Sequence, residues 1–178
     1  MMFGKDETTE ERLGKKFWKE ISSHNGFVML GLQGVENSRT RPMTAQVLKS
    51  DDADSEDPGQ IYFFASRSED LVRDMGTSHP AIATFASKGH GLFAHIHGTL
   101  ILDDDPAVID ALWNPIIASW FKDGKSDPDL ALIRFDTVKA DVWEAKALET
   151  LKAAAMKMVF DVDPGKEAQK EHQAAVEL

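Results

Sequence analysis

The chain has 178 residues, of which 42% are hydrophobic and 28% charged, a composition and length that suit one soluble globular domain. It contains no cysteine, which excludes disulfides, thiolate metal sites and cysteine nucleophiles. The net charge of −10 disfavours nucleic acid and anionic membranes as partners, and because no signal peptide or membrane-spanning run is recognisable, we expect a cytoplasmic location.

The N-terminal third predicts one helix followed by strands. Residues 8–23 carry apolar side chains at helical spacing, and Thr9 is the expected N-cap. The turn at Asn25-Gly26 ends this helix. Strands are then expected at 27–32, 40–48 and 61–65. The last of these is apolar throughout, which is typical of a central strand, and the acidic segment before it is typical of a solvated loop.

The remainder of the chain predicts further strands separated by helices. Ser68 is the expected N-cap of a short helix over 68–76. Helices are also expected at 107–121 and 146–159, and strands or extended segments at 81–87, 92–102, 130–138 and 140–144. Gly98 lies inside a predicted strand, where glycine often marks a bulge or the close approach of another backbone.

This order of elements favours a mainly β (β+α) fold, a small antiparallel barrel with peripheral helices. Neither a Rossmann-type alternation of strands and helices nor a glycine-rich phosphate loop is present. We expect residues 1–160 to form a single domain. Residues 161–178 are polar, and we expect a partly ordered tail or a short helix there.

Two arginines, Arg39 and Arg41, begin a predicted strand in an otherwise acidic chain. The guanidinium group presents a planar set of donors that matches phosphate oxygens. The alternation of a strand places both arginines on one face and Thr40 on the other. The pattern is compatible with a phosphate site, and the alternative interpretation is that these arginines only line a strand edge.

The segment 64–70 runs from the end of a strand into the start of a helix. Backbone N–H groups at a helix start favour an anion, and Ser66, Arg67 and Ser68 supply further donors. The alternative interpretation is an ordinary helix cap with an arginine that faces solvent.

Aromatic residues and histidines form two further groups. Trp113, Trp120, Phe121 and Trp143 could pack on a planar cofactor such as an isoalloxazine or a porphyrin. The first three also have spacings of seven and eight residues, which are typical of one buried helical stripe. His95 and His97 share one face of a strand, but no third ligand completes a set, so no metal site is predicted.

Six segments, in this order, resemble the general stress protein branch of the pyridoxamine-phosphate-oxidase-like, FMN-binding split barrels. They are RTRPMTAQ (39–46), IYFFASRSEDLVRDM (61–75), HPAIATFAS (79–87), FAHIHGTL (93–100), LWNPIIASWFKDGKSDPDLALIRF (112–135) and ADVWEA (140–145), and they cover most of residues 10–150. The resemblance implies a six- to seven-stranded antiparallel split barrel with peripheral helices. It also implies a homodimer with two FMN sites at the subunit interface.

The resemblance further implies which residues approach the flavin. The arginine-led strand and the later strand–helix turn hold the phosphate and ribityl chain, Phe93 approaches from a later strand, and Trp143 reaches the flavin of the partner subunit. The residues expected at the cofactor site are Arg39, Thr40, Arg41, Pro42, Met43, Gln46, Phe64, Ala65, Ser66, Arg67, Ser68, Asp70, Phe93, Trp113, Trp120 and Trp143. Thr44 or Gln46 is expected to hydrogen-bond the edges of the ring.

The chain departs from the family pattern in two places. Glu69 and Asp70 stand where the family commonly has a basic residue, and two carboxylates there oppose a phosphate unless they point away. Trp143 is followed by Glu144 rather than by an Arg-x-His motif, so vitamin B6 oxidation is not expected.

The predicted function is therefore that of an FMN-binding protein, with FAD as the alternative flavin. It is either a flavin-dependent oxidoreductase of unnamed substrate or a non-catalytic flavin carrier linked to stress. A third hypothesis is a haem-binding split barrel with His90, His95 or His97 as the iron ligand.

Overall fold

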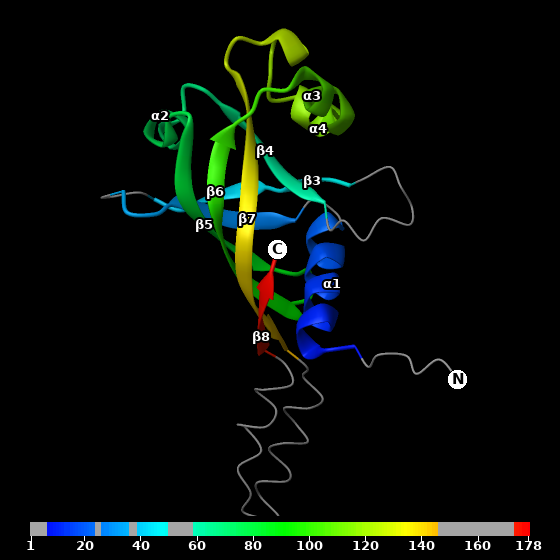
Figure 1. Cartoon of the computed structure of the whole chain (residues 1–178). Helices are drawn as coiled ribbons and strands as arrows, with labels where there is room; N and C mark the ends of the chain where they lie inside the picture. The colour runs from blue at the N-terminus through cyan, green and yellow to red at the C-terminus, as the bar shows by residue number, and fades with distance from the viewer. Residues whose placement is uncertain (1–6, 24–25, 36–38, 50–58, 146–172) are drawn as a thin grey trace, which may run out of the picture.

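The computed structural model describes residues 7–23, 26–35, 39–49, 59–145 and 173–178, which form one curled antiparallel sheet with helices around it (Figure 1). The strands are β1 (Phe27–Leu32), β2 (Arg41–Thr44), β3 (Gln46–Leu48), β4 (Gln60–Ser66), β5 (Ser78–Ala86), β6 (Leu92–Leu102), β7 (Leu130–Glu144) and β8 (Gln173–Glu177). The helices are α1 (Thr9–Ser22), α2 (Asp70–Met75), α3 (Pro106–Leu112), α4 (Pro115–Ala118) and the 3-10 turn η1 (Gly124–Ser126). Among the described residues, no helix is long and apolar enough to cross a membrane.

The order of the strands shows how the sheet curls. Seven strands follow one another as β2-β1-β5-β6-β7-β4-β3, and β8 pairs with β7 beside this path. The strands β2 and β3 lie at opposite ends of the order, yet only Ala45 separates them in the chain. The chain therefore passes from one edge of the sheet to the other at this residue, which is buried and donates its N–H to the carbonyl of Gly26. This confirms the antiparallel split barrel, and the single strand expected at 40–48 is divided between its two edges.

A β-bulge in the long strand pair β6–β7 bends the sheet. The register changes between His97, opposite Lys139, and Gly98, opposite Thr137, so that Val138 has no partner in this pairing. A Cβ atom at Gly98 would lie 2.4 Å from the carbonyl oxygen of Asp136. The predicted close approach of another backbone at this glycine is confirmed.

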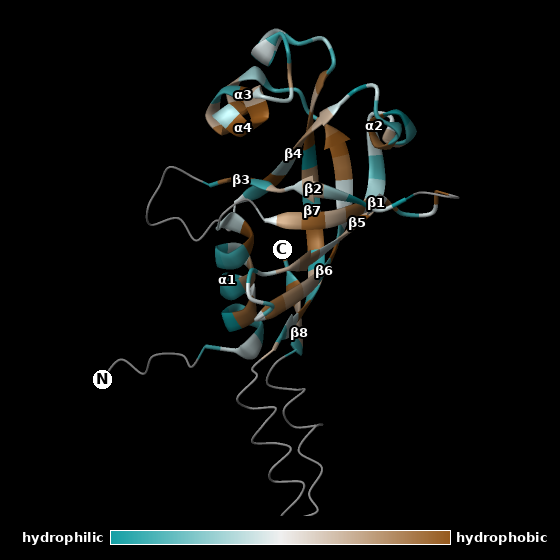
Figure 2. Ribbon diagram, turned by 180° about the vertical axis from the view of Figure 1, so that it is seen from behind, coloured by the Kyte–Doolittle hydropathy of each residue, from teal (hydrophilic) through white to brown (hydrophobic). Residues whose placement is uncertain are grey.

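The main core lies between the concave face of the sheet and helix α1. This helix is amphipathic and buries Leu13, Phe17 and Ile21, and its polar side faces outward in Figure 2. Its N-cap is Thr8, one residue earlier than expected. The reason is a capping box, in which the Thr8 and Glu11 side chains each accept a hydrogen bond from the other residue's backbone N–H.

A second core covers the outer face of β4 and β7 beneath α3 and α4. It contains Tyr62, Phe64, Ile109, Ile117, Phe121, Leu130 and Leu132. Strand β4 is therefore buried on both faces, which explains its continuous apolar sequence and confirms its central position.

The helix expected at 107–121 is broken in two. Pro115 lacks an N–H group and disfavours the helical conformation for Asn114 before it, and α3 ends at Leu112. The Asn114 side chain then caps α4 by accepting hydrogen bonds from the N–H groups of Ile116 (3.0 Å) and Ile117 (3.1 Å).

Part of the segment expected as a polar tail, residues 173–177, forms the strand β8 of the sheet, and residues 161–172 lie outside the described residues. Residues 173–177 pair with 139–143 of β7, and Val176 is buried against Gly14 of α1. A glycine in α1 lets the helix approach β8 closely at this point, because a Cβ there would lie 3.0 Å from a methyl carbon of Val176. The helix expected at 146–159 lies outside the described residues.

Candidate functional site

The fold brings the arginine-led strand and the strand–helix turn together. Arg41 opens β2, and Glu69 is the N-cap residue of α2. The Nη1 atom of Arg41 lies 2.5 Å from Oε2 of Glu69, and both side chains are about two-thirds buried. Residues 28 positions apart in the sequence (69 − 41) therefore form one ion pair at one end of the sheet.

This ion pair leaves polar atoms without hydrogen bonds. Arg41 Nε and Glu69 Oε2 are buried, and neither atom makes a hydrogen bond within the described residues. A buried donor of this kind is costly unless something accepts from it. The Nε–H of Arg41 is therefore suited to an anionic ligand, while the carboxylate of Glu69 opposes one.

Asp129 occupies the donors of the turn at 66–68. Its Oδ1 atom accepts the N–H of Ser68 at 3.0 Å, and its Oδ2 atom accepts hydrogen bonds from the hydroxyl groups of Ser66 and Ser68. The hydrogen bond from Ser66 is the main cause that lowers the pKa of Asp129, partial burial opposes it, and the bonds from Ser68 add to it. Asp129 therefore remains an anion at neutral pH, in the place where an anionic ligand would find donors.

The same contacts explain why Ser68 does not cap α2 as predicted. Its N–H and hydroxyl groups are directed at Asp129, so the helix begins two residues later at Asp70, with Glu69 as an N-cap that makes no side-chain cap bond. Asp70 itself pairs with Arg73 on the exposed side of the helix.

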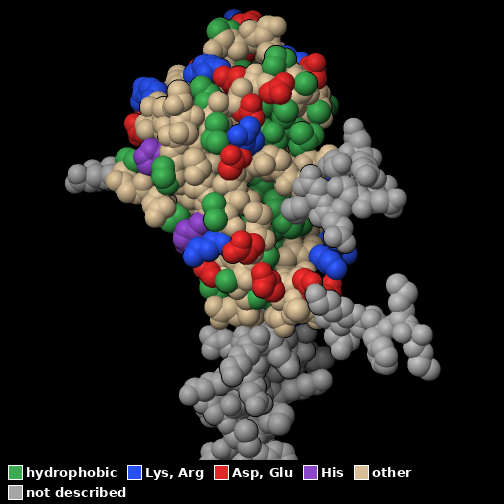
Figure 3. Space-filling view, viewed as in Figure 1, with side chains coloured by type: hydrophobic (Ala, Val, Ile, Leu, Met, Phe, Trp, Pro, Cys, Tyr) green, Lys and Arg blue, Asp and Glu red, His purple; other side chains and the backbone are tan. Residues whose placement is uncertain are grey.

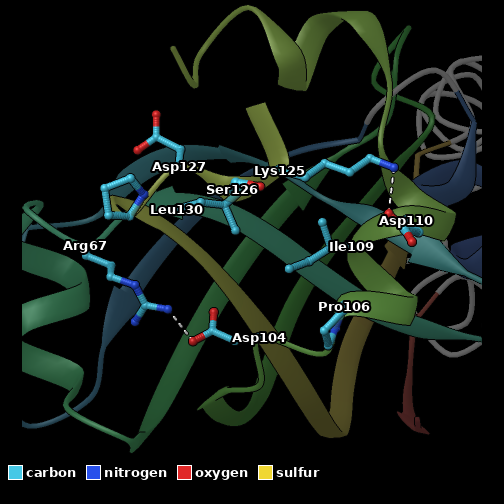
Figure 4. A pocket seen from close by; sticks show the side chains of 10 residues that line it. Arg67, Asp104, Pro106, Ile109, Asp110, Lys125, Ser126, Asp127 and Leu130 are labelled. Atoms are coloured by element: carbon cyan, nitrogen blue, oxygen red, sulfur yellow. Dashed lines mark hydrogen bonds and ion pairs between the residues drawn. The ribbon is translucent and has the colours of Figure 1, made fainter. Parts of the chain in front are cut away.

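Arg67 points away from this turn into a separate pocket. Its guanidinium group pairs with Asp104, and Lys125 pairs with Asp110 on the other side of the hollow (Figure 4). The pocket has a volume of about 300 Å³. It is lined by Arg67, Asp104, Pro106, Ile109, Asp110, Lys125, Ser126, Asp127, Pro128 and Leu130.

Other residues expected near the phosphate lie around β2 and β3. Arg39 and Thr40 are exposed and precede β2, so the strand alternation assumed for Arg39 does not apply to it. Pro42 is exposed, whereas Met43 is buried in the main core. Gln46 and Thr44 are half-buried; Gln46 lies opposite Tyr62 in the β3–β4 pair.

Two of the aromatic residues expected at the cofactor site, Phe64 and Trp113, meet in the second core beneath α3 and α4. Phe64 packs edge-on against Trp113, with 6.0 Å between ring centroids, in the second core. The neighbouring residue Ala65 lies in the main core on the opposite face of β4. Trp120 is 52% exposed beyond the break at Pro115, so Trp113 and Trp120 do not share one buried stripe. In Figure 3, hydrophobic side chains gather over α3 and α4.

The other two, Phe93 and Trp143, are partners on the outer face of the sheet. They lie directly opposite each other in the β6–β7 pair and are 39% and 38% exposed. Phe27 (68%) and Met29 (40%) are exposed on β1. An exposed group of large apolar side chains is typical of a surface that another molecule covers.

The histidines considered as ligands lie near the same face. His95 and His97 have ring centroids 4.6 Å apart, and His90 stacks on Phe93 at 6.3 Å. Within the residues that the structure describes, no three His, Asp or Glu side chains gather as metal ligands.

The sequence reasoning missed the carboxylates of Asp129 and Asp104. Asp129 lies in the segment 112–135, which entered the sequence analysis only as part of the family resemblance. Its contact with Ser66 joins residues 63 positions apart, so no local spacing reveals it. The only available signal was an aspartate immediately before strand β7, which lies beside β4 in the sheet.

Comparisons with known proteins agree with this fold and these motifs. The profile of the pyridoxamine 5'-phosphate oxidase like family matches residues 13–163. No curated protein matches the chain.

Three solved structures illustrate the similarity. The general stress FMN/FAD binding protein of Xanthomonas citri is 46% identical over 77% of this chain and 92% of its own, with a TM-score of 0.68. A general stress family protein of Xanthomonas campestris pv. campestris is 47% identical over 77% and 90%, with a TM-score of 0.67. A general stress protein 26 of Jannaschia is 28% identical over 95% and 99%, with a TM-score of 0.70. The chain belongs to the pyridoxamine 5'-phosphate oxidase like family, in its general stress protein branch.

Proposed function

We propose that this chain binds FMN, with its phosphate end beside Arg41 and the turn at 66–68. The observation that carries the proposal is the meeting of these two segments, in which a buried Nε–H of Arg41 has no acceptor among the described residues. The 46% identical protein of Xanthomonas citri, which is described as FMN/FAD binding, supports the same assignment. A site for one terminal phosphate favours FMN over FAD.

The second part of the site is proposed to come from another copy of the chain. Phe93 and Trp143 present adjacent aromatic side chains on an exposed face, where they are suited to cover an isoalloxazine ring. We propose a homodimer in which these residues of one copy approach the flavin held by the other. The exposed Phe27 and Met29 would be buried in the same interface.

Bound flavin supplies two-electron redox chemistry, and the residues of this chain would bind and orient it. We propose a flavin-dependent oxidoreductase. The alternative is a flavin carrier. The two hypotheses are distinguished by mixing the flavin-bound protein with NADH or NADPH in the absence of oxygen. Bleaching of the flavin absorption on the time scale of seconds supports the oxidoreductase. Flavin that no donor reduces supports the carrier.

The flavin assignment is tested by titrating the purified protein into FMN and following the quenching of flavin fluorescence. We expect saturable quenching by the wild type and a loss of FMN affinity of up to about tenfold in Arg41→Ala. Arg73→Ala is the control, because Arg73 is exposed on α2 and pairs with Asp70. A wild type that quenches neither FMN nor FAD would overturn the proposal. A haem-type absorption spectrum would support the histidine hypothesis instead.

A further inference from the structure

The two anion-binding elements of the proposed flavin site are already matched by carboxylates of the chain itself. Asp129 accepts hydrogen bonds from both hydroxyl groups and from one backbone N–H of the turn at 66–68. Glu69 lies 2.5 Å from the guanidinium group of Arg41. A carboxylate and a phosphate accept from the same donors, so each side chain stands in the place of a ligand oxygen.

A phosphate that enters this site meets two obstacles. It must displace the Asp129 carboxylate from Ser66 and Ser68, and it must lie close to two negative charges in a partly buried place, where Coulomb repulsion is stronger than in water. The ring and ribityl parts of a flavin carry no such charge. The Coulomb repulsion from the carboxylates therefore acts on the phosphate and not on these neutral parts.

We propose that Asp129 and Glu69 are specificity-determining residues that suppress the contribution of the flavin phosphate to binding. The chain then holds FMN only slightly more tightly than riboflavin, although its site has the donors of a phosphate site. This inference rests on the proposed function, because it concerns the same site. The inference also explains why the chain has the acidic Glu69 where the family commonly has a basic residue, since this carboxylate lies against Arg41 rather than pointing away from it.

Asp129 also orders the turn, and this role predicts a different result. If Asp129 acts only as a structural support for Ser66 and Ser68, removing its charge loosens the turn and weakens FMN and riboflavin alike. If it competes with the phosphate, removing its charge strengthens FMN alone. The ratio of the two affinities therefore distinguishes the two roles.

The experiment is a set of fluorescence titrations of the full chain with riboflavin and with FMN. For the wild type, we expect dissociation constants of the two flavins that agree within about tenfold. In Asp129→Asn and, independently, in Glu69→Gln, we expect FMN to bind about tenfold more tightly, while riboflavin changes by less than about twofold. The Glu69→Gln variant keeps the inference testable if Asp129→Asn fails to fold.

The control is Asp110→Asn, which removes the same charge from an exposed residue paired with Lys125. It should alter neither affinity by more than about twofold, since exposed charges are screened. FMN affinity that stays the same or falls in both site variants, with the wild type still binding flavin, overturns this inference and leaves the proposed function standing. A wild type that binds neither flavin overturns both.

Discussion

Arg12 of helix α1 donates a hydrogen bond of 2.8 Å to Oε2 of Glu144, the last residue of β7. Lys16, four positions later on the helix, contacts the other carboxylate oxygen. The Glu144 side chain is 3% exposed, so a buried carboxylate joins the helix to the end of the strand. Because Glu144 directly follows Trp143, this contact also fixes the strand end that carries an aromatic residue of the proposed site.

Replacing the carboxylate is expected to destabilise the protein. In Glu144→Gln, Arg12 and Lys16 lose their shared charged partner, and we expect the free energy of unfolding to fall by about 2–3 kcal/mol. Urea denaturation measures the change. The control is Glu7→Gln, which removes one carboxylate from an exposed ion pair with Lys15 and should change the stability by less than about 0.5 kcal/mol. Equal effects of both substitutions would contradict the role of the buried carboxylate.

The same residue predicts an acid-sensitive stability. Burial by itself raises the pKa of Glu144, but hydrogen bonds and charges from Lys16 and Arg12 outweigh it and lower the pKa from 4.5 to about 2. A carboxyl group whose pKa is lower in the folded state stabilises the protein above the unfolded value, and this stabilisation is lost as the pH falls. The loss should therefore run from about pH 4.5 to about pH 2. Denaturation curves measured at several pH values in this range give the free energy of unfolding as a function of pH. This free energy should change less with pH in Glu144→Gln than in the wild type, and an identical pH dependence would contradict the assignment.

The bulge between β6 and β7 predicts a strong requirement for glycine. A Cβ at position 98 would meet the Asp136 oxygen at 2.4 Å and a Phe135 ring carbon at 2.7 Å, neither of which is the end of a flexible side chain. Gly98→Ala should lower the free energy of unfolding by about 2–3 kcal/mol, because strands must separate to admit the methyl group. Gly91→Ala is the matched control, since a Cβ there meets nothing within 4 Å. Thermal unfolding measures the stability of both variants. A Gly98→Ala protein as stable as the wild type would show that the bulge is absent.

The exposed aromatic face predicts association through β6 and β7. Phe93→Glu places a charge opposite Trp143 and should weaken the proposed dimer by about tenfold or more, because the charge would be buried without a partner. Sedimentation velocity of the wild type should give a dimer and that of the variant mainly a monomer. Ile116→Glu is the control on α4, where the replaced side chain is 54% exposed. A monomeric wild type would contradict the prediction, as would a dimer that only Ile116→Glu disrupts.

The sequence was informative where the local pattern agreed with the tertiary structure. The apolar run at 61–65 predicted a central strand because both faces of β4 are buried, and Gly98 marked the bulge because only a residue without a side chain fits there. The division of 40–48 between two sheet edges was not predictable in this way. It follows from closure of the sheet at Ala45, which depends on strands far along the chain.

The candidate site shows the same limit. Arg41 and the turn at 66–68 were identified from residue type, and the structure places Glu69, the residue after this turn, 2.5 Å from Arg41. The role of the Asp129 carboxylate was not predicted, because a hydrogen bond between residues 63 positions apart produces no recognisable spacing in the sequence. Pro115 is a local signal for the end of a helix. The helical spacing of Trp113 and Phe121 nevertheless led to the prediction of one continuous helix over 107–121.

The most direct measurement is a crystal structure of the wild-type protein grown with excess FMN. The account predicts that the flavin phosphate lies within hydrogen-bond distance of the Arg41 guanidinium group and the turn at 66–68, with Trp143 of a second copy over the ring. FMN bound in the pocket between Arg67 and Lys125, with the contacts of Arg41 to Glu69 and of Asp129 to Ser68 intact, would contradict it.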